Sequence, residues 1–498
     1  MTPEARLAQP FGTLPELLAL HAKRAPRRPA LVQGERHLDY GELDTLANRI
    51  AARLQGDGMR RGEVVAICAP ASIEYVAIFL GALRAGVVVA PLAPSLTPES
   101  IAAMIADCQA RRVYRGESLD GWLAPRGSAP AAVEIEPLDA FNIIYSSGTT
   151  GSPKGIVQPH AMRWVHMQRG PAYGYAPESI TLISTPLYSN TTLVAVFPTL
   201  ATGGTVVLMP KFDATAYLET AARHRATHTM LVPVQYQRIM ALADFGRHDL
   251  ASFHMKFSTS APFAAALKAD VLARWPGGLI EYYGMTEGGG TGILFAHDNP
   301  DKLHTVGRPG PGHDIRVIDE EGRELPRGAT GEFVGHSPAM MTGYHNRPEK
   351  TAEAEWFDAG GKRFIRTGDV GRFDDDGFMV LLDRRKDLII SGGFNIYPSD
   401  LEAVVARHPE VAEVAVVAKP SPQWGETPFA FVVATKGSRL DPGELLQWAN
   451  AQLGRTQRIA GVRLIDALPR NPTGKVLKRE LREALELVTA VTFSRKIN

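Results

Sequence analysis

The chain has 498 residues, 45% hydrophobic and 21% charged, which indicates a globular protein of about two to four domains. Lysine plus arginine is 54 and aspartate plus glutamate is 53, so charge gives no reason to expect a nucleic-acid, membrane-surface or polyanionic partner. Cys68 and Cys108 are the only cysteines, and their spacing argues against a zinc site or a disulfide framework. The sequence shows no signal-peptide pattern and no run of about 18 apolar residues, so we expect a cytoplasmic protein without a membrane span.

Short apolar runs alternate with helical patterns over the first 300 residues or so, which predicts an α/β architecture. Two helices stand out, because residues 43–56 close on a glycine and residues 72–85 follow Ser72, a candidate N-cap. The expected strands in this part are residues 64–68, 87–92, 141–145 and 205–209.

From about residue 307 the sequence is rich in glycine and turns, and residues 316–319 and 331–334 predict a small β-subdomain. The charged cluster 383–387 lies between the strand-like runs 378–382 and 388–390, and we interpret it as a hinge. The segment beyond it predicts a compact α+β domain of about 110 residues. Its expected elements are helices 399–406 and 442–453 and strands 414–418 and 430–434.

The most informative stretch is Tyr145 to Gly155, where three glycines, five Ser/Thr hydroxyls and one lysine occur in eleven residues. Glycines let backbone N–H groups approach phosphate oxygens, hydroxyls add donors, and Lys154 adds a positive charge. The Walker pattern requires Ser or Thr directly after the lysine, and Gly155 stands there instead. An ordinary Ser/Gly-rich surface loop is the alternative, but the stretch favours an ATP-binding loop over a P-loop.

Further motifs follow in order: Tyr-Tyr-Gly-Met-Thr-Glu at 282–287, Arg-Thr-Gly-Asp at 366–369, Asp-Arg-Arg-Lys at 383–386 and Asn-Pro-Thr-Gly-Lys at 471–475. With these motifs, nearly the whole chain resembles the adenylate-forming enzymes: acyl- and aryl-CoA synthetases, luciferases and nonribosomal adenylation domains. Residues 389–398 and the Trp-Gly-Glu turn at 424–426 are most similar to aryl- and medium-chain acyl-CoA ligases such as 4-chlorobenzoate:CoA ligase.

The resemblance implies an α/β fold with a large multi-sheet N-terminal domain, made of two wound α/β sheets and a small β-subdomain, and a small mobile α+β C-terminal domain. The expected bounds are 1–383 for the N-terminal domain, 384–386 for the hinge and 387–498 for the mobile domain, with Lys386 as the hinge residue. In this family the C-terminal domain rotates between two half-reactions. The sequence is compatible with a homodimer and with a monomer.

The implied chemistry is attack of a carboxylate on the α-phosphorus of ATP, which gives an acyl-adenylate, followed by displacement of AMP by a thiol. Two anions meet in the first step, so preorganised donors and cations are needed. By resemblance Thr286 and Lys475 contact the α-phosphate, Glu287 binds Mg²⁺ and Asp369 accepts the ribose hydroxyls. The implied ATP-binding set is Ser146, Ser147, Gly148, Thr149, Thr150, Gly151, Lys154, Tyr283, Gly284, Thr286, Asp369, Arg384 and Lys475.

The resemblance also implies a CoA site, at which Gly392 and Gly393 leave room for pantetheine while Trp424 and Arg458 hold the nucleotide. Arg455 is an alternative to Arg458, because this segment departs from the family pattern. The expected acyl pocket is lined by Tyr188, Asn190, Gln235, Tyr236, Phe257, Thr259, Gly284 and Gly289. This set contains no lysine or arginine, which favours an apolar acid over a dicarboxylate, and the triple glycine 288–290 is expected to lengthen the pocket.

We therefore expect an AMP-forming carboxylic acid:CoA ligase that uses ATP, Mg²⁺ and CoA and an aromatic or medium- to long-chain acid. The alternatives are a stand-alone adenylation domain that loads a carrier protein, a luciferase-like oxygenase and a non-catalytic nucleotide-binding protein. Taken singly, Asp369 is compatible with a turn, and Glu287 and Lys475 with solvated surface; only the order of the motifs favours a site. His304 and His313 carry no predicted role.

Overall fold

The computed structural model describes residues 1–116, 118–145, 154–384, 387–391, 394–454, 457–471 and 474–485, and only the backbone of residues 394 and 395. The chain forms two compact units: unit 1 holds residues 1–315 and 334–366, and unit 2 holds residues 316–333 and 367–498. This division falls at a different place from the predicted domain boundary at 383. Lys386, the predicted hinge residue, lies outside the described residues.

The larger sheet of unit 1 is parallel from β1 to β12 and antiparallel at both edges. In spatial order its strands are β14 (Arg308–Pro309), β13 (Gly292–Phe295), β12 (Gly278–Tyr283), β11 (Met255–Ser258), β10 (His228–Leu231), β8 (Ile180–Ile183), β9 (Thr205–Leu208), β1 (Pro29–Gln33) and β2 (Arg36–Asp39). The strands that the sequence predicts at 205–209 and 64–68 are confirmed, as is the α/β class.

The second sheet of unit 1 is parallel over β5, β3, β4 and β6, and ends in the antiparallel pairs β6–β7 and β7–β17. Its strands in order are β17 (Gly343–Tyr344), β7 (Gly155–Pro159), β6 (Ala140–Tyr145), β4 (Val88–Pro91), β3 (Val64–Ile67) and β5 (Arg112–Tyr114). Along β3, Val65 and Ile67 enter the main core while Val64 and Ala66 enter a second cluster on the opposite face. Both faces are covered, which explains why the predicted strands are continuous apolar runs.

Local capping signals decide where the helices of unit 1 begin. Ser72 accepts a hydrogen bond from the Tyr75 N–H at 3.1 Å, which confirms the predicted N-cap. The helix predicted at 43–56 begins earlier, because Asp39 and Glu42 form a capping box. The helices are α1 (Pro3–Leu7), α2 (Leu14–Arg24), α3 (Tyr40–Gly56), α4 (Ile73–Arg84), α5 (Pro98–Asp107), α6 (His160–Gln168), α7 (Asn190–Ala201), α8 (Ala214–His224), α9 (Pro233–Met240), α10 (Ala265–Arg274) and α11 (Pro348–Glu353), with 3₁₀ turns η1 (Leu119–Trp122), η2 (Gly170–Tyr173), η3 (Phe245–Arg247) and η4 (Pro300–Lys302).

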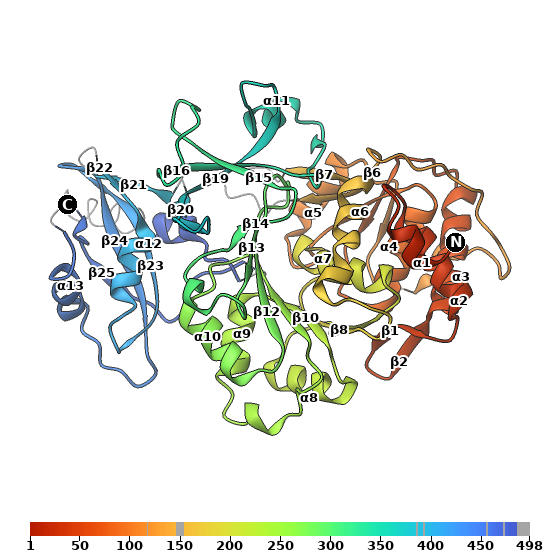
Figure 1. Cartoon of the computed structure of the whole chain (residues 1–498), viewed down its shortest axis with the longest axis horizontal. Helices are drawn as coiled ribbons and strands as arrows, with labels where there is room; N and C mark the ends of the chain where they lie inside the picture. Colours follow the sequence, from red (N-terminus) through yellow and green to blue (C-terminus); the bar gives the residue numbers. More distant parts are fainter. Residues whose placement is uncertain are drawn as a thin grey trace, which may run out of the picture. The chain divides into compact units, whose positions relative to one another are not determined.

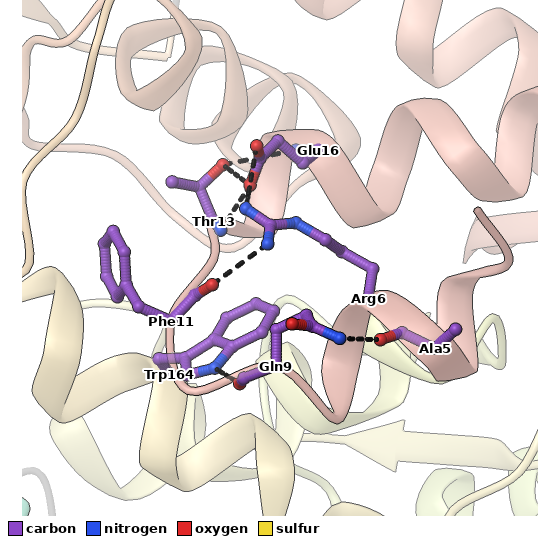
Figure 2. Close-up of polar contacts among 7 residues, drawn as sticks. All are labelled: Ala5, Arg6, Gln9, Phe11, Thr13, Glu16 and Trp164. Carbon is purple, nitrogen blue, oxygen red and sulfur yellow. Dashed lines mark hydrogen bonds and ion pairs between the residues drawn. The ribbon is translucent and has the colours of Figure 1, made fainter.

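Helices α6 and α7 pack against each other between the two sheets of unit 1 (Figure 1), since α6 contacts β6 and β7 while α7 contacts β8, β9 and β10. The N-terminal segment holds α6 from outside (Figure 2): the Trp164 indole N–H donates to the Gln9 carbonyl at 3.0 Å. Arg6 braces this segment by donating to the Phe11 carbonyl at 3.0 Å and pairing with Glu16 at 2.8 Å. The helix that carries Arg163 is thereby fixed on both sides.

A further sheet contains β15 (Asp314–Ile318), β16 (Gly331–His336), β19 (Arg363–Phe373), β18 (Glu355–Phe357) and β20 (Met379–Arg384), and the division between the units falls within β15, β16 and β19. Unit 2 also has a sheet of β22 (Phe394–Ile396), β21 (Ile389–Ser391), β24 (Gly425–Ala434), β23 (Val411–Ser421) and β25 (Val462–Leu464). Helices α12 (Pro398–Val405) and α13 (Pro442–Asn450) contribute Leu401 and Leu445 to the core on one face of it. The predicted C-terminal α+β elements are confirmed. Among the described residues, no helix is both long and apolar enough to cross a membrane.

Candidate functional site

The predicted ATP-binding loop connects the two strands of a hairpin. Strands β6 and β7 are antiparallel, and Tyr145 pairs with Gly155 on either side of residues 146–153. The predicted phosphate ligands Ser146, Ser147, Gly148, Thr149, Thr150 and Gly151 lie outside the described residues. Lys154 is described, and its Nζ lies 5.0 Å from the centroid of the Tyr344 ring.

A buried polar network lies beneath this hairpin. Asn142 of β6 and Gln158 of β7 are register partners, both fully buried, and the Asn142 amide donates to Gln158 Oε1 at 2.9 Å. Arg163 of α6 donates from Nε to Asn142 Oδ1 at 3.0 Å and also donates to Gln158 Oε1. These bonds orient the Gln158 amide, and its Nε2 donates to the Thr286 carbonyl at 2.7 Å. The hairpin and the Thr286 turn are therefore connected by one side chain.

Arg163 is an unusual residue to bury. Its side chain is fully enclosed, and within the described residues it forms no ion pair with a carboxylate. Its guanidinium carbon lies 5.8 Å from the Phe141 ring centroid and 5.6 Å from that of Phe197. Burial lowers the pKa of Arg163 to about 9, so it stays charged near neutral pH. A charged donor makes the Gln158 amide a more strongly polarised donor towards Thr286.

Glu287, which follows Thr286, is held by strand β17. The Tyr344 hydroxyl donates to Glu287 Oε1 at 2.8 Å, and the Met341 N–H donates to the Glu287 carbonyl at 2.8 Å. Tyr344 thus contacts both Lys154, which lies over its ring, and the Glu287 carboxylate. The structure thus places both the cation expected to bind phosphate and the carboxylate expected to bind metal against one tyrosine.

The glycines after Glu287 are explained by close packing. Gly288 has φ of +79° and Gly289 has φ of +85°, and all of Gly288, Gly289 and Gly290 are buried. A Cβ atom on Gly288 would overlap the Ala339 carbonyl oxygen, and one on Gly289 would lie 2.9 Å from the Gly335 carbonyl oxygen. The space beside Gly288 and Gly289 is therefore filled by neighbouring backbone, and that beside Gly290 by the Ile315 side chain, in contrast to the expected lengthening of the pocket.

The residues predicted to line the acyl pocket fall into packed and accessible groups. Tyr236 and Phe257 are fully buried, and the Tyr236 hydroxyl donates to the Phe257 carbonyl at 2.9 Å. Gln235 is also buried, and its Oε1 accepts from the Val232 N–H at 3.1 Å. Tyr188, Asn190 and Thr259 are half-buried, and Gly284 is exposed.

Unit 2 brings together the predicted ribose contacts. Asp369 of β19 and Arg384 of β20 are register partners, and Arg384 Nε lies 3.1 Å from Asp369 Oδ1. The Thr367 hydroxyl accepts from the Asp369 N–H at 3.0 Å, which fixes the start of this turn.

Lys475 lies on a tight turn of unit 2. The Asn471 side chain accepts from the Lys475 N–H at 2.9 Å, and Gly474 takes φ of +82° within the turn. Arg470 braces the turn by donating to the Gly474 carbonyl at 2.7 Å while pairing with Glu413 at 2.7 Å. The lysine is thereby presented on a braced loop.

Trp424, one of the predicted CoA residues, lies at one end of the C-terminal sheet. Trp424 is 52% exposed between β23 and β24, and Ile390 of the adjacent β21 is 55% exposed. The Ile390 N–H donates to Glu426 Oε2 at 2.9 Å, and Ser391 pairs with Gly425, so β21 lies beside the start of β24, which Trp424 directly precedes. Arg458 is exposed, whereas Gly392, Gly393 and Arg455 lie outside the described residues.

The metal prediction rests on Glu287 alone. No group of three or more His, Cys, Asp or Glu side chains placed to hold a metal occurs in the part of the chain that the structure describes. Glu287 supplies one carboxylate, and Mg²⁺ takes one or two carboxylates together with phosphate oxygens and water.

Sequence reasoning missed the side chains that support the site: Asn142, Gln158, Arg163 and Tyr344. A signal existed for the first two, because amides interrupt otherwise apolar strands on both sides of the loop. Arg163 and Tyr344 carry no local pattern that links them to Glu287.

Comparisons with known proteins extend over nearly the whole chain. A family model described as AMP-binding enzyme matches residues 18–345, and one described as AMP-binding enzyme C-terminal domain matches residues 400–475. The chain is 32% identical to the fatty acid–[acyl-carrier-protein] ligase ScoC of Streptomyces coeruleorubidus, with 96% of this chain and 98% of that protein covered. It is 34% identical to a feruloyl-CoA synthase of an Amycolatopsis species, with 93% and 96% covered. The solved structure of ATP-bound MatB from Rhodopseudomonas palustris matches with a TM-score of 0.86 at 30% identity, covering 95% of this chain and 99% of that one.

The packing of Gly288 makes a direct prediction. Gly58 has nearly the same φ, +77°, but nothing lies within 4 Å of its Cβ position, so Gly58→Ala is a matched control for backbone strain alone. We expect Gly58→Ala to lower the free energy of unfolding by about 1–2 kcal/mol. Gly288→Ala should cost at least about 1 kcal/mol more, because the methyl group meets the Ala339 carbonyl. Urea unfolding of both variants measures the difference, and equal losses would contradict the packing account.

Proposed function

Since the chain belongs to the AMP-binding enzyme family of adenylate-forming acid–thiol ligases, we propose that it is an AMP-forming carboxylic acid:CoA ligase for an aromatic or medium- to long-chain acid. The observation that carries the proposal is the joining of the ATP-loop hairpin to the Thr286–Glu287 turn through Gln158 and Tyr344. It supports a site in which donors, a cation and a carboxylate are held in place before the substrates arrive.

In the first half-reaction an oxygen of the acid attacks the α-phosphorus of ATP, and pyrophosphate leaves. Lys154 would neutralise the polyphosphate, and Thr286 would donate to the α-phosphate. Glu287 would hold Mg²⁺, which supplies positive charge to the phosphate oxygens. Asp369 and Arg384 would bind the ribose, and their adjacent positions on β19 and β20 are consistent with one shared contact region. Lys475 would bridge the carboxylate and the α-phosphate.

In the second half-reaction the CoA sulfur attacks the acyl carbon of the adenylate, the thiol proton is released, and AMP leaves. The exposed indole of Trp424 beside exposed Ile390 supports a flat apolar contact for the CoA nucleotide. Gly392 and Gly393 would leave room for pantetheine, and Arg458 would pair with a phosphate.

The second candidate is an enzyme that transfers the acyl group to a carrier protein. It is favoured by the similarity to ScoC, whose printed name is that of a fatty acid–[acyl-carrier-protein] ligase. In that case Trp424 would contact the carrier or its pantetheine arm.

The test is release of pyrophosphate with a panel of benzoates, cinnamates and fatty acids, run with CoA, with a carrier protein in its pantetheinylated form, and with neither. We expect turnover that requires CoA, and acyl-CoA in the product by mass. Acylated carrier without acyl-CoA would favour the second candidate. Absence of pyrophosphate release with every acid would contradict adenylate formation itself.

Two substitutions should separate the half-reactions. Lys475→Ala should lower the rate of adenylation by about 100-fold or more, because the bridging cation is lost, while a supplied acyl-adenylate still reacts with CoA.

Trp424→Ala should affect the second half-reaction instead. It should raise the CoA concentration at half-maximal rate by about tenfold and leave the rate of adenylation unchanged. Single-turnover assays of each half-reaction measure both effects. Loss of both half-reactions in either variant would contradict the assignment of separate roles.

A further inference from the structure

A cluster of basic side chains lies beyond the end of α6, outside the set predicted to line the acyl pocket. His166 is on α6, Arg169 follows the helix, and His313 directly precedes β15. Arg169 Nη2 lies 2.6 Å from His313 Nε2, and the Thr291 N–H donates to His313 Nδ1 at 2.8 Å. Burial lowers the pKa of Arg169, and the nearby phenols of Tyr173 and Tyr282 act on that pKa in the opposite direction.

Within the described residues, each ring nitrogen of His313 faces a hydrogen-bond donor. A neutral imidazole has one accepting nitrogen and one N–H, whereas a guanidinium only donates. Both ring nitrogens of His313 face donors, Arg169 on one side and the Thr291 N–H on the other. Burial lowers the pKa of His313 to about 4, so protonation does not relieve the conflict at neutral pH and would add a further donor. An additional acceptor beside Arg169 would resolve it.

No acid in the described part of the chain supplies that acceptor. Burial lowers the pKa of His166, and the neighbouring groups that lower it further are Arg163, Arg169 and His313, all of them bases. The Nδ1 atom of His166 is buried without a hydrogen-bond partner. Asp314, the next residue after His313, pairs with Lys362 at 2.7 Å. The cluster therefore presents nitrogen donors and a positive charge with no protein carboxylate to receive them.

The cluster adjoins the region where the acid is expected. Tyr282 stacks on Phe257 with ring centroids 5.7 Å apart and planes within 8°, and it directly precedes Tyr283 and Gly284. Thr291, whose N–H donates to His313, has its hydroxyl 3.5 Å from the Cβ position of Gly284. His166, Arg169, Tyr173, Tyr282 and His313 each keep part of their surface accessible.

We propose that Arg169, with His166 and His313, binds an acceptor oxygen at the far end of the acid substrate, and that the substrate is an aromatic acid carrying such an oxygen as a hydroxyl or a second carboxylate. The aromatic rings of Tyr173 and Tyr282 supply flat walls for the ring of the acid. This inference rests on the proposed function. It changes the expectation of a purely apolar pocket, because Arg169 was not in the predicted lining and His313 had no predicted role.

The test compares matched acids in ATP–pyrophosphate exchange: benzoate, phenylacetate and cinnamate, each unsubstituted, with a 4-hydroxyl and with a 4-carboxylate. We expect the wild-type enzyme to prefer one of the oxygen-bearing acids in kcat/KM by about tenfold or more over its unsubstituted parent. The substituent that the enzyme prefers shows whether the acceptor oxygen of the substrate belongs to a hydroxyl or to a second carboxylate. Arg169→Met should reduce this preference to less than about threefold.

Arg49→Met is the matched control. Arg49 is a half-buried arginine of α3 that donates to the Ala124 carbonyl at 2.9 Å, and this substitution should leave the substrate preference unchanged. A wild-type enzyme without preference, or equal loss for substituted and unsubstituted acids in Arg169→Met, would overturn the proposal. Exchange with the unsubstituted acids keeps the proposed function standing in either case. No exchange with any of these aromatic acids would overturn this proposal but not the proposed function, which the fatty acids of its own panel then test.

Discussion

The site depends on how one buried amide, that of Gln158, is satisfied. Its oxygen accepts from Asn142 and Arg163, and its nitrogen donates to the Thr286 carbonyl. A buried amide that lost these partners would cost about 1–3 kcal/mol, so the three elements that supply them are held to one arrangement. The hairpin and helix α6 are consecutive in sequence, whereas Thr286 follows Gln158 by 128 positions, and this contact makes them a single support.

The charge distribution around that support explains how two anionic substrates can be brought together. Arg163 lies beneath the hairpin without a carboxylate partner among the described residues, and Lys154 lies at its end. Arg169 extends the same pattern along α6. Uncompensated positive charge is costly in the empty protein, but it becomes favourable when phosphate or carboxylate oxygens approach. The N-terminal segment supplies part of the rigidity that keeps these cations in place, because it holds Trp164 from the opposite side of α6.

The sequence predicted those features that depend on local pattern. Ser72 is an N-cap because a serine stands three residues before the Tyr75 N–H, and β3 is a strand because both of its faces are apolar. The strand that leads into the ATP-binding loop followed from its apolar residues 141–145, but β7, the strand after the loop, was not predicted. The network around Gln158 could not be predicted in this way, since it depends on the register of β6 and β7 and on the distance between α6 and β12. Gly288 and Gly289 show the same limit: the sequence shows the glycines, but not the backbone of Ala339 and Gly335 that fills the space beside them.

The most direct test of this account is the rate of ATP–pyrophosphate exchange in Gln158→Leu, which removes the contact to Thr286 and keeps the side-chain size. Gln55→Leu is the matched control, because Gln55 of α3 also bonds to backbone, donating to the Ala131 carbonyl at 3.0 Å and accepting from the Ala131 N–H at 2.8 Å, but outside the site. The account predicts that exchange falls by about tenfold to 100-fold in Gln158→Leu and stays within about twofold of wild type in Gln55→Leu. Wild-type exchange in a folded Gln158→Leu enzyme would contradict the claim that this amide holds the site together.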